Sequence, residues 1–143
     1  MHTVSLLETT GTAAALVLAG VWSLALGGVS GWAVAAAFHP SKMLERVGVE
    51  HPRRVLQLHL DWIIMGCVMV AVGLSTPTAP GWAHVLVLAG AIVNPLLFAP
   101  LMFSSGWYTN RAYVAISLTS FTALSVGLVA CAVSSTARLV GWP

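Results

Sequence analysis

Charged residues are scarce in this sequence of 143 residues. Only four are acidic and six are basic, which is 7% of the chain, against roughly 25% in a soluble domain. So few charges cannot cover a surface exposed to water, and 58% of the residues are hydrophobic. The composition therefore predicts an integral membrane protein. The basic residues form no long run, so nucleic acid is not an expected partner.

Several common chemical motifs are also missing. The two cysteines, Cys67 and Cys131, have no paired spacing, which argues against a disulfide framework and against a zinc site. Both are expected to be small packing residues inside apolar helices. There is no His-x-x-x-His pair, no glycine-rich phosphate loop and no serine nucleophile elbow. Hydrolase chemistry and nucleotide-dependent chemistry are therefore not expected.

Four apolar stretches are present, each long enough to cross a bilayer core as a helix, which needs about 20 residues. They cover about residues 11–38, 54–75, 82–103 and 112–133. The predicted fold class is all-α, a single domain of four transmembrane helices in a bacterial-type inner membrane. The glycines of the first stretch favour close helix packing within a bundle or an oligomer.

The segment 39–54 is the one strongly polar stretch, and it carries four of the six basic residues. The positive-inside rule places it on the cytoplasmic side, together with the loop 104–111. Ser41 is expected to cap a short interfacial helix in this segment. Arg138 and Trp142 are expected to anchor the C-terminal end at the opposite interface.

Two ionisable residues lie inside the second stretch, His59 and Asp61. An ionisable group in hydrocarbon is costly unless it is paired or used, so both are candidate functional residues. Residues two apart on a helix point about 200° apart, so the two side chains face different sides. In one interpretation, His59 faces a ligand and Asp61 faces a neighbouring helix or subunit. Asp61 would then pair with Arg54, Arg111 or a basic residue of another protomer.

Antiparallel packing of the four stretches brings the first and third connections to one side of the membrane. From the rise per residue, His59 lies roughly 8 Å and Asn94 roughly 13 Å below that side. The sequence therefore predicts that His59, Asn94 and the loop 107–111 line one shallow pocket. Pro95 predicts a kink at this depth, and Pro100 is expected to help end the third stretch.

Structural alternatives are open for these residues. A lone buried histidine such as His59 is often a hydrogen-bonded packing residue, and Asn94 also fits a helix–helix hydrogen bond. Tyr108 fits an ordinary interfacial anchor. Three further histidines near span ends are expected to be solvated at the interface: His39, His51 and His84.

The run His59-Leu60-Asp61, with Gly66 after it and Gly90-x-x-x-Asn94 one span later, resembles a known family. The family is that of small four-helix membrane proteins that include styrene oxide isomerase and hydroxylaminobenzene mutase. The resemblance covers about residues 55–111. It implies a homotrimer with haem b between protomers, and His59 as the axial ligand of the iron.

The same resemblance implies the other site residues. Met65 and Gly66 would lie beside the haem, and Asn94 would hold the substrate or a developing oxyanion. Asp61 and Tyr108 are further candidate catalytic residues, Tyr108 as a phenol supplied from the loop.

The chain departs from the isomerases at three positions of the pattern. Met65 stands where they carry Asn, Gly90 where they carry an acid, and Phe98 where they carry Tyr. The His-Leu-acid start and the Gly-x-x-x-Asn spacing are closer to the mutase branch.

The implied function is an intramolecular rearrangement of a small apolar aromatic substrate. Either an aryl epoxide becomes an aldehyde, or an arylhydroxylamine becomes an aminophenol, with ferric iron as Lewis acid in a dry cavity. One alternative is a haem-binding subunit without catalysis, for which the sequence offers no good second intramembrane histidine. Another is a small-molecule-binding or assembly bundle without cofactor, in which His59 and Asp61 serve packing alone.

Overall fold

The computed structural model describes residues 11–39 and 43–141, and these residues form helices joined by short connections, with no strand among them. The helices are α1 (Thr12–Ala37), α2 (Pro52–Ser75), α3 (Gly81–Leu96), α4 (Phe98–Phe103) and α5 (Arg111–Leu139), with the 3₁₀ helices η2 (Glu45–Val47) and η3 (Ser105–Thr109). In the described part, four stretches are long and apolar enough to cross a membrane: α1, α2, α3 with α4, and α5. The prediction of an all-helical chain with four apolar spans is therefore confirmed.

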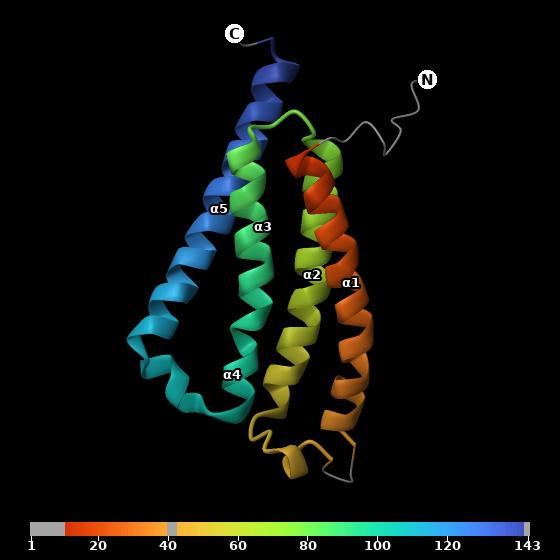
Figure 1. Cartoon of the computed structure of the whole chain (residues 1–143), viewed down its shortest axis with the longest axis vertical. Coiled ribbons are helices and arrows are strands. Elements are labelled where there is room, and N and C mark those ends of the chain that lie inside the picture. Colours follow the sequence, from red (N-terminus) through yellow and green to blue (C-terminus); the bar gives the residue numbers. More distant parts are fainter. Residues whose placement is uncertain (1–10, 40–42, 142–143) are drawn as a thin grey trace.

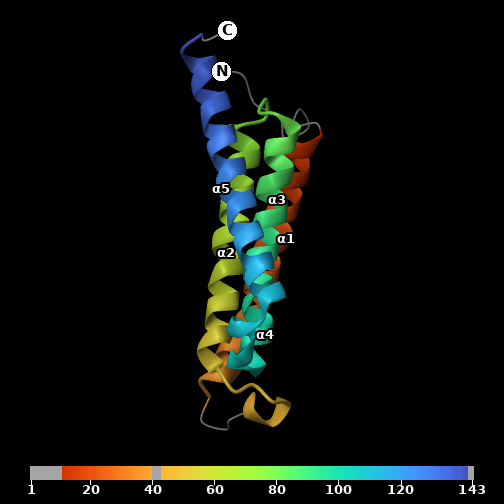
Figure 2. The ribbon, with the colours of Figure 1, turned by 90° about the vertical axis from the view of Figure 1, so that its left-hand side faces the viewer.

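The long helices run side by side along the longest axis of the molecule (Figure 1, Figure 2). The α1–α2 connection, α4 and η3 lie together at one end, which we call the site end. The start of α1, the α2–α3 connection and the end of α5 lie at the other end. The predicted convergence of the first and third connections is therefore confirmed.

The predicted spans agree with the helices except at the C-terminal end. The last helix continues to Leu139 instead of ending at 133. Ser and Thr lower the hydropathy there without interrupting the helix, which stops only before Gly141 with its positive φ of 66°. The segment 39–54 does contain a short helix, η2, as predicted. Ser41 and Trp142 lie outside the described residues.

Two prolines, Pro95 and Pro100, lie in the second half of the third span. The expected interruption after Pro95 is present, since α3 ends at Leu96 and α4 begins at Phe98. The span ends at Phe103, three residues after Pro100, at the predicted position. Pro100 is in the first turn of α4, where a missing N–H costs no helical hydrogen bond.

Two tightly packed helix pairs, α1 with α2 and α3 with α5, build the molecule. A Cβ added to Gly20 of α1 would come within 2.8 Å of the backbone oxygen of Gly66 in α2. A Cβ on Gly90 of α3 would come within 2.8 Å of the backbone oxygen of Ser120 in α5. Only glycine permits so close an approach of two backbones, as the first span's composition predicted.

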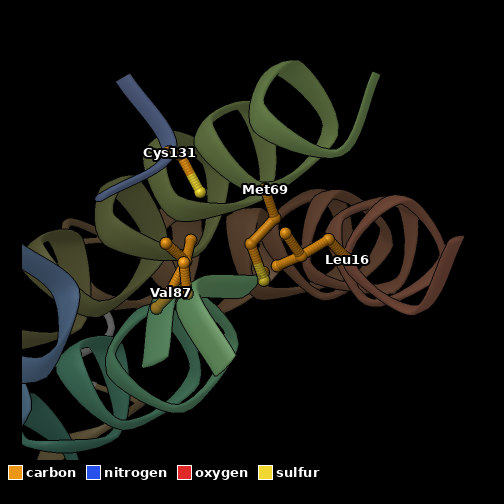
Figure 3. Packing of buried hydrophobic residues seen from close by; sticks show 6 residues of the cluster. Leu16, Met69, Val87 and Cys131 are labelled. Carbon is orange, nitrogen blue, oxygen red and sulfur yellow. The ribbon is translucent and has the colours of Figure 1, made fainter. Parts of the chain in front are cut away.

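The apolar core lies between the two pairs, and Figure 3 shows its packing. Its buried members come from every long helix: Leu16, Met69, Ala83, Val87, Ala91 and Cys131. Cys131 is therefore a packing residue, as predicted, whereas Cys67 lies exposed on the outer surface.

His84 corrects one prediction, because it is not solvated at an interface but only 1% exposed. Its Nε2–H donates to the carbonyl oxygen of Thr76 at 3.0 Å, and its Nδ1 accepts from the hydroxyl of Thr12 at 3.0 Å. A buried imidazole must satisfy both nitrogens, and the first turn of α3 brings it between the start of α1 and the end of α2. Through these two hydrogen bonds, His84 of α3 links the start of α1 to the end of α2.

Candidate functional site

At the site end, α5 diverges from α3 and α4 (Figure 1). A pocket there is lined by residues of α2, α3, α4, η3 and α5. The close contact of Gly90 with α5 keeps α3 and α5 together nearer the middle of the molecule. The pocket has a volume of about 380 Å³. Its polar lining is Asp61, Asn94, Tyr108, Tyr113 and Ser117, and its remaining lining is apolar. We call it the Asp61 pocket.

Asp61 is a partly buried carboxyl group on α2 that lines this pocket. No hydrogen bond or ion pair to another described residue is present. The predicted pairing within the chain is wrong, because Arg54 donates instead to Gln57 and lies over the ring of Tyr108. Arg111 is exposed at the start of α5. Among the described residues, Asp61 therefore has no partner that would keep it from acting on an occupant of the pocket.

Asn94 is only 3% exposed and lies in the last turns of α3. Its Oδ1 accepts a hydrogen bond of 2.6 Å from the hydroxyl of Ser120 in α5. The expected helix–helix hydrogen bond of Asn94 is thus present. This bond occupies the amide oxygen and leaves the Nδ2 hydrogens as donors at the wall of the pocket.

Two tyrosines form the mouth of the Asp61 pocket. Tyr113, in the first turn of α5, donates from its hydroxyl to the carbonyl oxygen of Leu97 at 3.0 Å. Tyr108 of η3 meets the Tyr113 ring edge-on, with centroids 6.4 Å apart. Sequence reasoning missed Tyr113 and Ser117. Their spacing of four residues, continued by Phe121, marks one face of the last helix and was the signal available.

His59 faces away from this pocket. Its Nδ1 lies 2.9 Å from the carbonyl oxygen of Gly27 and 3.2 Å from the hydroxyl of Ser30, both on α1. The predicted pocket of His59, Asn94 and the loop is therefore corrected: Asp61 takes the place of His59. The cause is helical geometry, since residues two apart cannot share a side and the α1 carbonyl holds the imidazole.

The hydrogen bond to Gly27 also fixes the state of the imidazole. A carbonyl oxygen only accepts, so Nδ1 carries a hydrogen, and in the neutral imidazole the lone pair is then on Nε2. Nε2 has no hydrogen-bond partner among the described residues, and it is not one of their buried side-chain atoms. This nitrogen is therefore not fully enclosed by the described residues.

Met65 and Gly66 have packing contacts. Met65 packs against the apolar core, and Gly66 is buried where α2 meets Leu24 of α1. Within residues 11–39 and 43–141, no three His, Cys, Asp or Glu side chains gather to hold a bare metal ion. A metal here would need to bring most of its own ligands, as haem does.

Of the predicted site residues, the structure brings together Asp61, Asn94 and Tyr108. It leaves His59 on another face of α2. Comparisons of the chain with protein-family models, with curated proteins and with solved structures each found no match.

Proposed function

We propose that this chain is a membrane isomerase that rearranges a small apolar aromatic substrate with the help of haem b. The substrate is an aryl epoxide that becomes an aldehyde, or an arylhydroxylamine that becomes an aminophenol. The protein would act as a homotrimer in a bacterial-type inner membrane, where such substrates dissolve. The observation that carries the proposal is the orientation of His59.

His59 fits the requirements of an axial ligand. Metal-ligating histidines donate their second N–H to a carbonyl or carboxylate, which fixes the tautomer and aims the free nitrogen. The Gly27 carbonyl accepts such a bond from Nδ1 and leaves Nε2 free. Haem iron held by His59 would supply Lewis-acid chemistry to a substrate oxygen.

The Asp61 pocket fits a small aromatic substrate. Its volume of about 380 Å³ falls within the range of roughly 300–1,000 Å³ of small-molecule sites. Phe98, Tyr108 and Phe121 offer ring surfaces to an aromatic substrate. Apolar walls exclude water, which protects a cation that develops beside the ring.

Two polar groups have defined parts to play in this pocket. The Nδ2–H groups of Asn94 donate to the oxygen atom on which negative charge develops. The carboxylate of Asp61 stabilises the developing positive charge, or accepts the proton that leaves during the rearrangement. Neither part requires a cosubstrate, because the reaction is intramolecular.

Because His59 and Asp61 face different sides of α2, the proposed reaction depends on how protomers assemble. A group held at Nε2 of His59 does not lie in the Asp61 pocket of the same chain. Combining the two therefore requires an oligomer in which His59 of one protomer meets the pocket of the next. This condition agrees with the trimer that the resemblance implies.

A rearrangement assay tests the proposal. Membranes that contain the protein are supplied with styrene oxide or with phenylhydroxylamine, and phenylacetaldehyde or aminophenol is measured by chromatography. Product is expected from one substrate with the wild type and with the control His39→Ala, whose histidine is exposed near the end of α1. It is expected to disappear in His59→Ala. Equal rates in both variants would overturn the proposal.

A non-catalytic bundle is the second candidate, and the hydrogen bonds themselves favour it. Partners on neighbouring helices already account for His59 and for Asn94. In that case, no substrate is converted and the protein binds no haem. Substitutions at both residues then change stability alone.

A further inference from the structure

A second cavity, of about 650 Å³, lies at the site end of the molecule. It is bounded by the end of α1, the start of α2, α4 and η3, and we call it the vestibule. It is next to the Asp61 pocket, and Leu101 and Tyr108 line both spaces. The vestibule contains neither His59 nor Asn94, so what it binds does not depend on the proposed function.

Positive charge dominates the lining of the vestibule. Arg53 and Arg54 line it, against the single carboxylate of Glu50. Arg54 is held in place, because Nη1 donates to Gln57 and the guanidinium lies 5.3 Å from the centroid of the Tyr108 ring. Arg53 is exposed. One guanidinium is therefore oriented in advance, and the other is free to close on a ligand.

Unused hydrogen-bonding groups lie beside these arginines. His51 lines the vestibule, and its Nε2 is the one buried side-chain N or O atom without a partner among the described residues. His51 also gives the start of α2 no side-chain cap, which leaves the N–H of Arg53 uncapped at the positive end of a long helix. The backbone N–H groups of Glu50 and His51 both donate to Met102, which fixes this segment against α4.

The other wall of the vestibule is apolar, with Ala37, Phe38 and Leu101. The vestibule lies where the membrane-length helices α1 and α2 end and begin, which is the level of lipid headgroups. A ligand for this space has an anionic group and an apolar part. Guanidinium groups pair with phosphate oxygens in a two-point geometry that few other side chains match.

We propose that the vestibule is a binding site for the phosphate group of an anionic phospholipid. Arg53 and Arg54 hold the phosphate oxygens, and the imidazole of His51 and the start of α2 add hydrogen-bond donors. The glycerol and upper acyl chains lie along Phe38 and Leu101. Inorganic phosphate offers the same anionic group without the apolar part.

Native mass spectrometry of the delipidated full-length protein in mild detergent tests this site. Phosphatidylglycerol and phosphatidylcholine are titrated in turn, and bound lipid is counted per protomer. The variant Arg53→Gln/Arg54→Gln is compared with Arg46→Gln, which removes a cation from the adjoining α1–α2 connection but does not line the vestibule. Arg53→Gln alone serves as a second variant, because this side chain is exposed and its loss is expected to leave the fold intact. Inorganic phosphate is added as competitor.

Phosphatidylglycerol is expected to bind more tightly than phosphatidylcholine. Its affinity is expected to fall roughly tenfold or more in the double variant, several-fold in Arg53→Gln and not in Arg46→Gln. Equal binding of the two lipids, or an equal loss in Arg46→Gln, would overturn the proposal. Displacement of the lipid by millimolar inorganic phosphate would also overturn it and would assign the site to a free phosphate.

Discussion

The Nδ1 atom of His59 lies 2.9 Å from the carbonyl oxygen of Gly27, across the contact between α1 and α2. This one bond sets the tautomer of the imidazole and turns it away from Asp61, two residues further along α2. The two ionisable groups of this span therefore serve different faces of the molecule. Asp61 belongs to the pocket between α2, α4 and α5, and His59 faces α1.

The substitution Asp61→Asn distinguishes between a catalytic and a structural role of the Asp61 carboxylate. The carboxyl group has no partner in the described chain, so its neutralisation is expected to leave the thermal midpoint unchanged or higher. The rearrangement rate is expected to fall by roughly a hundredfold, the usual effect of losing an electrostatic group in a dry site. Differential scanning fluorimetry and the product assay measure the two effects. A large loss of stability or of oligomer size would instead indicate an ion pair with a neighbouring protomer.

Ser120→Ala tests the hydrogen bond that holds Asn94. Without the serine hydroxyl, the amide oxygen loses its donor between α3 and α5. The free energy of unfolding is expected to fall by about 0.6–2 kcal/mol, as for other hydrogen bonds between membrane helices. Titration with a denaturing detergent measures this quantity. Thr119→Ala, at the exposed neighbouring residue, is the control, and an equal loss in both variants would contradict the assignment.

Gly90→Ala tests the close approach of α3 and α5. The new Cβ would meet the backbone oxygen of Ser120 at 2.8 Å, so the helices must separate. Overpacking of this kind costs about 1–3 kcal/mol of the free energy of unfolding. Gly28→Ala is the matched control, since a Cβ there has nothing within 4 Å. Thermal midpoints in detergent are expected to fall for Gly90→Ala alone, and equal midpoints would refute the packing.

His84→Ala tests the hydrogen bonds by which His84 links α1, α2 and α3. The change empties a buried space and leaves the carbonyl of Thr76 without its imidazole donor. A loss of about 2 kcal/mol or more in the free energy of unfolding is expected. His39→Ala, at an exposed histidine, is expected to have little effect. The same loss in both variants would remove the structural distinction between these two histidines.

Much of the fold follows from the sequence because its signals are strong. Long apolar stretches and scarce charge predict the four spans, and glycine predicts the tight contacts of α1. The break at Leu97 lies between two prolines, and Pro100 has no N–H to donate to the carbonyl oxygen of Leu96, four residues earlier. The extension of α5 to Leu139 does not follow from hydropathy, since hydropathy measures the membrane core and not the end of a helix.

The candidate site was harder to predict for a physical reason. Periodicity shows that His59 and Asp61 face different sides but does not say which side meets the pocket. That choice depends on the register of α1 against α2, which brings the Gly27 carbonyl to the imidazole. The buried state of His84 depends in the same way on Thr12 and Thr76, which are distant in the sequence.

The visible absorption spectrum of the purified protein tests the central claim most directly. The protein is made in cells supplied with a haem precursor, purified in mild detergent and compared with His59→Ala and His39→Ala. A Soret band in the wild type and in His39→Ala, absent from His59→Ala, is the predicted result. A colourless wild type, or a Soret band that survives in His59→Ala, would contradict haem ligation by His59.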